Sequence, residues 1–145
     1  MAFKTITAAN SIYMLAIDTV YPVYQQIQGF AADAAFTSEA NQIGDTVMGV
    51  DAHLSVGYVP SAYVQTITLM PDSPSFEIFQ NWASAERRIR EVLIASATIT
   101  LPSIGQKYAL TKGVLTNYKP LPDVQRLLAE TQFQITWERV EASPF

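Results

Sequence analysis

A chain of 145 residues corresponds to one domain, and it can bury roughly 68–70% of the surface of its unfolded form without a metal or a disulfide. It has no cysteine, which excludes disulfides, thiolate metal sites and a cysteine nucleophile. Hydrophobic residues make up 49% of the chain and charged residues only 15%, against about 25% in ordinary soluble domains. This low fraction of charged residues favours a subunit whose surface is covered on several sides by other copies of the same chain.

The net charge of −4 is unevenly distributed. Residues 1–72 carry six acids and one base (−5), whereas residues 73–145 carry seven acids and eight bases (+1), which together give −4. The asymmetry is either chance at these small counts or the mark of a polar subunit whose ends attract head to tail.

The N-terminal part predicts strands and no targeting segment. Met1–Thr5 precedes no apolar run long enough for a signal peptide, and the longest apolar run, Ile12–Ile17, is far short of the ~20 residues of a membrane span. We therefore expect synthesis in the cytoplasm and no membrane insertion. Ser11–Ala16 and Thr19–Gln28 are predicted to pair as strands, with Pro22 placing one of them at a sheet edge.

Gly29–Asp45 is predicted to be a long extended loop. Loops of more than about 12–15 residues are uncommon in compact domains, and this one is too apolar for a solvated linker because it holds two phenylalanines and five alanines. Left exposed, it would be adhesive. It is either an arm that contacts a neighbouring subunit or a hairpin or short helix packed on its own domain. The candidate inter-subunit contacts are Phe30, Ala34, Phe36, Ile43 and Asp45.

Two further segments, Ala52–Val59 and Tyr63–Met70, have the Val, Thr, Tyr and Ile content of strands. The first contains His53, the only histidine, with Asp51 and Ser55 two residues away on either side. Same-face strand neighbours lie roughly 6–7 Å apart at the backbone, too far for the contacts of a catalytic triad. His53 is therefore interpreted as a surface or interface residue.

One amphipathic helix is predicted over Pro74–Val92. Ser73 can cap it and Pro74 suits the first helical position. Apolar residues at three- and four-residue spacing form one stripe: Phe76, Phe79, Trp82, Ala83, Ile89 and Leu93. On the opposite side, Glu86 is expected to pair with Arg90 and Arg87 with Glu91.

In the C-terminal part, Leu93–Leu101 and Thr131–Val140 alternate apolar and polar residues with period two, as half-buried strands do. Tyr108–Tyr118 is predicted to be another strand, bent at Gly113. Trp82 and Trp137 fall on apolar faces and are expected in the core. The predicted fold is one mainly β (α+β) domain over residues 1–145. It has two packed antiparallel sheets, as a sandwich or barrel, one flanking amphipathic helix and the long loop.

Little in the sequence indicates chemistry. One histidine, no cysteine and scattered glycines provide no metal site and no phosphate-binding loop. The basic cluster of Arg87, Arg88 and Arg90 is flanked by acids, which favours a solvated helix face over a nucleic-acid site. We expect no catalytic residue, no metal and no cofactor.

Several runs resemble the bacteriophage tail tube protein family. They are Thr66–Ser75 followed by Phe79–Trp82, then Thr98–Tyr108 and Phe133–Val140, together with Gly49–Asp51 and Gly57–Pro60. These motifs are structural, and the similarity covers most of the chain. Ala52 departs from the pattern, because glycine is expected after Asp51, so the local turn geometry there is open.

The resemblance implies a two-sheet fold with a flanking helix, similar to the type VI secretion tube protein. It implies hexameric rings stacked into a hollow tube of the virion, with contacts to sheath, baseplate and tape-measure proteins. Phage DNA would pass through the lumen without specific binding. An acidic wall would repel that DNA, and Asp45 and Asp51 are the candidate lumen-facing residues.

Three other functions stay open. A tube initiator or baseplate component of the same fold differs little in sequence from a tube subunit. A non-catalytic ligand-binding β-domain would line one groove with exposed aromatic residues. A hydrolase would have to use His53.

Overall fold

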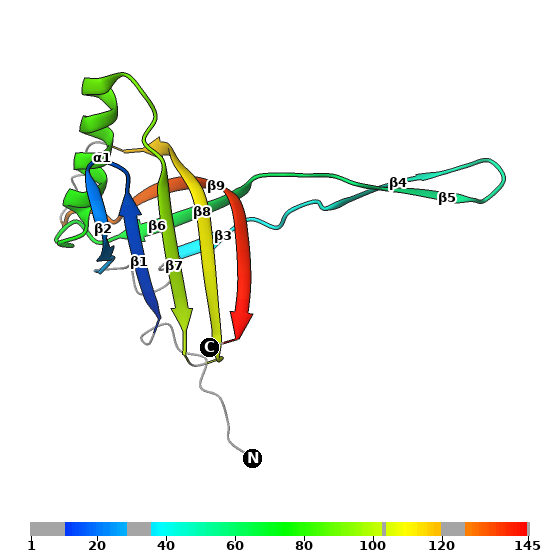
Figure 1. Cartoon of the computed structure of the whole chain (residues 1–145), viewed down its shortest axis with the longest axis horizontal. Helices are drawn as coiled ribbons and strands as arrows, with labels where there is room; N and C mark the ends of the chain where they lie inside the picture. Colours follow the sequence, from blue (N-terminus) through cyan, green and yellow to red (C-terminus); the bar gives the residue numbers. More distant parts are fainter. Residues whose placement is uncertain (1–10, 29–35, 103, 120–126, 145) are drawn as a thin grey trace, which may run out of the picture.

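The computed structural model describes residues 11–28, 36–102, 104–119 and 127–144. Within these ranges the chain forms nine strands and one helix (Figure 1). In chain order they are β1 (Ile12–Ile17), β2 (Tyr21–Gln26), β3 (Phe36–Ser38), β4 (Gly44–Met48), β5 (Leu54–Tyr58), β6 (Tyr63–Leu69), α1 (Phe76–Ile89), β7 (Ala95–Leu101), β8 (Gln106–Tyr118) and β9 (Thr131–Pro144).

Seven strands form one antiparallel sheet in the order β2-β1-β7-β8-β9-β6-β3, and β4 pairs with β5 in a second sheet. The large sheet bends over the core, since residues of β1 meet residues of β3 and β6 from near its other edge. The Tyr13 hydroxyl donates to Gln65 Oε1 at 2.8 Å, and the rings of Tyr13 and Phe36 meet edge to face at 5.4 Å. The mainly β prediction, with two antiparallel sheets and one helix, is confirmed.

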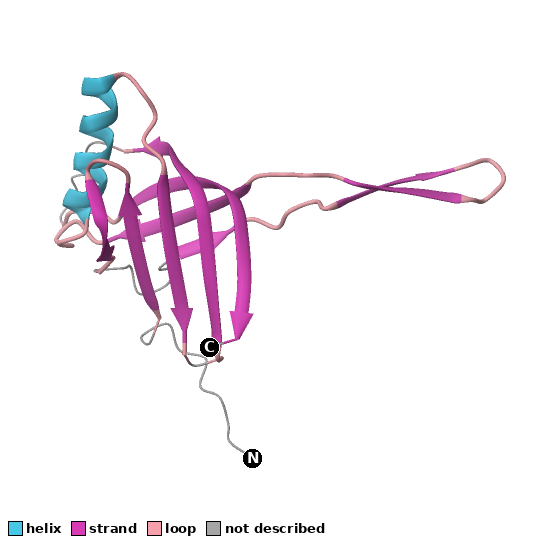
Figure 2. Ribbon diagram, viewed as in Figure 1, coloured by secondary structure: helices cyan, strands magenta, loops and turns pink. Residues whose placement is uncertain are grey.

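The two packed layers are the two halves of this bent sheet. Among the described strands they do not close into a barrel, because the edge strands β2 and β3 do not pair with each other. β2 carries Pro22 and lies at an edge, as predicted. The second sheet does not pack on the body at all: β4 and β5 project away from it as a separate hairpin (Figure 2).

Strand β9 connects the two halves. It pairs with β8 along almost its whole length and with β6 through Thr131–Trp137. The predicted alternation holds, because Phe133, Ile135 and Trp137 are buried while the residues between them are not. Both tryptophans are fully buried, as expected.

The bend predicted at Gly113 coincides with an irregularity in β8. The pairing register with β7 shifts here, and Lys112 adopts a positive φ of 53°. Gly113 lies opposite Trp137 on β9, whose indole ring covers it. A Cβ atom at Gly113 would lie 2.5 Å from Trp137 Cε3 and 2.8 Å from Cη2. Only glycine lets this ring lie so close to the strand.

The helix begins two residues later than predicted, because two serines order the turn before it. Ser73 Oγ accepts a hydrogen bond from the Ser75 amide at 3.1 Å and donates to the Gln28 carbonyl at 2.5 Å. Ser75 Oγ accepts from the Gln28 amide at 2.7 Å. Ser75 is the N-cap residue, and the predicted cap, Ser73, instead ties this turn to the end of β2.

Phe76, Phe79 and Trp82 of the predicted apolar stripe are buried, with Phe79 stacked on Phe133 at 4.5 Å. Ile89, also predicted in the stripe, is 43% exposed, and Leu93 lies beyond the end of the helix. The helix ends at Ile89, short of the predicted Val92, because Arg90 turns into the left-handed region at φ 63°. The two predicted helix ion pairs are wrong, because these four side chains form no ion pair with a described residue. Ion pairs instead join Lys112 to Glu138 and Arg139 to Glu141, on β8 and β9. Glu86 instead accepts from the Leu93 amide at 3.4 Å.

No helix in the described ranges is long and apolar enough to cross a membrane.

Candidate assembly surface

The hairpin of β4 and β5, with the segments that join it to the body, forms an arm over residues 39–62. The arm interrupts the connection between β3 and β6, which are neighbours in the sheet. Its base is closed by hydrogen bonds from the Glu39 amide to the Val64 carbonyl at 3.1 Å and from Asn41 Nδ2 to the Ala62 carbonyl at 2.9 Å. Beyond this base the arm extends away from the sheet and the helix (Figure 1).

The tip of the arm is a tight turn over residues 49–53. The Gly49 amide donates to the His53 carbonyl at 2.8 Å, and Asp51 Oδ1 accepts from the His53 amide at 3.3 Å. Ala52 has φ 63°, in the left-handed region that favours glycine. The absence of the expected glycine therefore leaves the turn in place, with strain at this residue.

The register of the hairpin assigns its side chains to two faces. Directly paired residues of antiparallel strands point to the same face, and successive residues alternate. One face, here called the apolar face, carries the pairs Thr46–Val56 and Met48–Leu54, and Tyr58 opposite Gly44. The other face, called the polar face, carries the pairs Asp45–Gly57 and Val47–Ser55.

The apolar face is exposed. Met48 is 63% exposed, Val56 74% and Tyr58 80%, and every residue of β4 and β5 is exposed. Four large apolar side chains on one side of a protruding ribbon form the kind of patch that marks an interaction surface.

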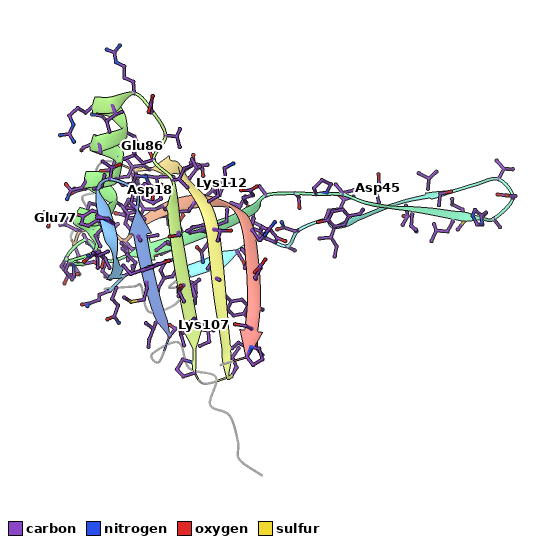
Figure 3. The ribbon with its side chains drawn as sticks, in the orientation of Figure 1. Asp18, Asp45, Glu77, Glu86, Lys107 and Lys112 are labelled. Atoms are coloured by element: carbon purple, nitrogen blue, oxygen red, sulfur yellow. The ribbon has the colours of Figure 1, made fainter. Side chains whose placement is uncertain are left out.

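The predicted contact residues are placed differently. Phe36 lies in β3 and packs, half-buried, on the core of its own chain. Ile43 is exposed on the arm. Asp45 is on the polar face by the register of the hairpin, and Figure 3 shows it on the arm, away from the body. Asp51 lies at the tip. Phe30 and Ala34 lie outside the described residues.

The sequence analysis predicted a loop over residues 29–45, of which the structure describes residues 36–45: residues 36–38 form β3, and residues 39–45 are the first part of the arm. The interpretation missed Met48, Leu54, Val56 and Tyr58. The signal was present in the alternation of Leu54, Val56 and Tyr58, which the sequence analysis assigned to an ordinary strand.

The body contains a groove of about 330 Å³ between its two layers. Buried residues line its floor, namely Gln65, Ile99, Leu110 and Trp137, and half-buried apolar residues line its walls, namely Phe36, Tyr63, Val64, Leu101, Tyr108 and Val140. Three exposed polar residues complete the lining, namely Thr37, Ser38 and Glu39. This assembly groove, as we call it below, is therefore mostly apolar and rich in aromatic rings.

Gln65 is the polar group of the groove floor. Its Oε1 accepts two hydrogen bonds, from the Tyr13 hydroxyl at 2.8 Å and from Trp137 Nε1 at 3.1 Å. Burial raises the pKa of Tyr13 far above its ordinary value, so its hydroxyl stays protonated and donates. These bonds fix the amide orientation, and in the described part of the chain Nε2 of Gln65 has no hydrogen-bond partner.

The same fold occurs in components of a phage-tail-like particle. A chain from the six-fold symmetrised baseplate of the anti-feeding prophage matches 99% of this chain over 98% of its own length, with a TM-score of 0.60 and 10% identity. A chain from the tube-terminating cap of the same particle matches 100% of this chain over 95% of its own, with a TM-score of 0.63 and 13% identity.

The chain belongs to the family described as tail fiber protein gp32, whose model matches residues 4–141. No curated protein matches it. The coarser part of the sequence interpretation, a virion-associated structural protein of the phage-tail type, is confirmed.

Proposed function

We propose that this protein is a ring-forming subunit of a phage tail tube. Copies assemble into hexameric rings, and the rings stack into a hollow conduit for DNA. The function is structural and needs no catalytic residue or cofactor. Sheath, baseplate and tape-measure proteins are its expected partners in the tail.

The observation that carries this proposal is the arm. In an isolated subunit, the arm projects from the body and exposes four large apolar side chains on one face to water. Such an exposed apolar patch is typical of a surface that binds another protein. Head-to-tail contacts between copies form closed rings at a suitable rotation and an open filament when rings stack. An arm that reaches beyond its own body is suited to such contacts.

Charge supports the same proposal. The carboxylates of Asp45 and Asp51 lie on the exposed arm, and the first half of the chain is acidic. If these residues face the lumen, the wall repels DNA and lets it pass. Replacing both by lysine is then expected to slow DNA passage through assembled tubes and leave tube formation intact.

A second candidate is a tube initiator, cap or baseplate ring. The specific observation in its favour is that two similar solved chains come from structures of such parts, a baseplate and a tube-terminating cap. A terminal ring and a tube subunit differ in one measurable property: the terminal ring stops at a defined size, whereas tubes lengthen with protein concentration.

Negative-stain electron microscopy together with sedimentation at low and high concentration tests the proposal. We expect hollow rings of uniform width, with tubes that grow longer as concentration rises. Rings of fixed size would instead favour the terminal-ring candidate. A monomer at every concentration, even after addition of a tail-tip complex, would refute both.

A shortened variant provides the control. Replacing Gly44–Tyr58 by a two-residue Asn-Gly turn keeps the strand order of the body, because the arm is an insertion between β3 and β6. The variant is expected to fold, as judged by circular dichroism, and to form no tubes.

A further inference from the structure

The two faces of the arm differ in the free energy of burying them against another surface. The apolar face bears Met48, Leu54, Val56 and Tyr58, whereas the polar face bears the Asp45 carboxylate. Burying a carboxylate without a partner is far more costly than burying apolar side chains, which stabilises a complex. The apolar face is therefore the one suited to burial.

The occupant of this face belongs to another molecule. β4 and β5 contact each other and extend beyond the body, and all ten of their residues are exposed (Figures 1 and 3). The described residues of the chain therefore leave the apolar face uncovered.

The assembly groove has the complementary properties. Its walls are apolar and aromatic apart from the exposed Thr37, Ser38 and Glu39, and its volume of about 330 Å³ is roughly twice the ~150 Å³ of a cavity that accommodates one benzene molecule. The groove therefore has room for one aromatic ring and one aliphatic side chain. On the arm, Tyr58 and Val56 are neighbours on the apolar face and are its two most exposed members.

The polar groups are complementary as well. A tyrosine that becomes buried requires a hydrogen-bond partner for its hydroxyl. The floor of the groove offers Nε2 of Gln65, a donor without a partner among the described residues, whose orientation is fixed by Tyr13 and Trp137. The Tyr58 hydroxyl can accept from it.

We propose that the apolar face of one copy's arm docks in the assembly groove of a second copy, with Tyr58 and Val56 inserted and the Tyr58 hydroxyl bound by Gln65. This inference rests on the proposed self-assembly and identifies the two surfaces that meet. The polar face, with Asp45, stays in water.

Cysteine cross-linking tests the docking, because the chain has no cysteine of its own. The donor protein carries Val56→Cys on the apolar face, and the matched control carries Val47→Cys on the polar face. The two valines are similarly exposed, at 74% and 66%. Each is mixed with a size-tagged acceptor protein that carries Leu101→Cys in the wall of the groove, and the mixture is oxidised under assembly conditions.

We expect a disulfide-linked heterodimer of the tagged and untagged chains from Val56→Cys and at least tenfold less from Val47→Cys. Equal yields from both positions, or none from either while microscopy shows normal rings, would overturn the docking and leave the proposed function standing. A Val56→Cys cross-link without rings or tubes at any concentration would support the docking and refute the tube.

The hydroxyl is tested separately in the Tyr58→Phe variant, which keeps the ring and folds with an unchanged body. Loss of one hydrogen bond of roughly 1 kcal/mol corresponds to about fivefold weaker association, measured as the shift of the sedimentation midpoint. The matched variant is Ser55→Ala on the polar face, which is expected to leave the midpoint unchanged. An unchanged midpoint for Tyr58→Phe would overturn the role of Gln65.

Discussion

The packing of Trp137 over Gly113 makes a quantitative prediction for the Gly113→Ala variant. The added methyl group would lie 2.5 Å from Cε3 of the indole ring, where an ordinary contact needs at least 3.4 Å. The ring is fully buried and its Nε1 donates to Gln65, so it cannot move by about 1 Å without breaking this hydrogen bond.

Overpacking of this kind costs about 1–3 kcal/mol, and the strained hydrogen bond adds about 1 kcal/mol. We therefore expect Gly113→Ala to lower the free energy of unfolding by about 3 kcal/mol. At about 2–4 °C per kcal/mol for a chain of this size, the melting temperature falls by about 6–12 °C.

The assay is thermal and urea unfolding followed by circular dichroism and tryptophan fluorescence. It is run at a concentration where the protein sediments as a monomer, because self-association raises the apparent stability. Gly57→Ala is the control, since a Cβ atom there meets nothing within 4 Å. The reasoning is refuted if Gly113→Ala stays within 0.5 kcal/mol of the wild type, or if Gly57→Ala is destabilised equally.

Three further substitutions have expected signs, each measured by urea unfolding. Thr131→Val is expected to stabilise by about 1 kcal/mol, because Oγ1 is buried without a partner in the described part of the chain, and Thr131→Ser should give no gain. Arg90→Gly is expected to stabilise by about 0.5–1 kcal/mol, because Arg90 is left-handed and exposed, and loss of stability would contradict this. Burial raises the pKa of Glu86 above its ordinary 4.5, so its folded form binds a proton more readily than the unfolded chain. Stability should therefore fall as pH rises from 4.5 through the shifted pKa, and Glu86→Gln should remove this dependence and be the more stable form at pH 7.

Period-two patterns gave correct predictions for the strands of the body. Thr131–Val140 lies within β9, whose residues from Thr131 to Trp137 alternate between buried and more exposed positions. Tyr63–Met70, predicted from its residue content, matches β6 to within one residue. The helix was also predicted, but its ends were wrong. Its start is displaced by hydrogen bonds between Ser73, Ser75 and Gln28. Gln28 lies 45 or more positions before the two serines in sequence, so no local pattern reveals these bonds.

The loop predicted over residues 29–45 and the arm over residues 39–62 overlap only in part, for a different reason. The content of valine, threonine and tyrosine in Ala52–Val59 indicates a strand but not its partner. A strand of the main sheet and a strand of a free-standing hairpin can have the same residue content. Contacts distant in sequence decide which other strand each one pairs with. The assembly groove was beyond sequence reasoning, since β3, β6, β7, β8 and β9 come together only through the bend of the sheet.

The arm leaves the body after β3 and returns at β6, two strands that are paired with each other at Ser38 and Gln65. The body therefore closes without any contribution from the residues between. Insertions, deletions and substitutions within the hairpin leave the strand order of the sheet untouched, so the length and chemistry of the arm are free to diverge between related chains. Compatibility between subunits can change in this one exposed stretch while the scaffold that presents it is inherited intact.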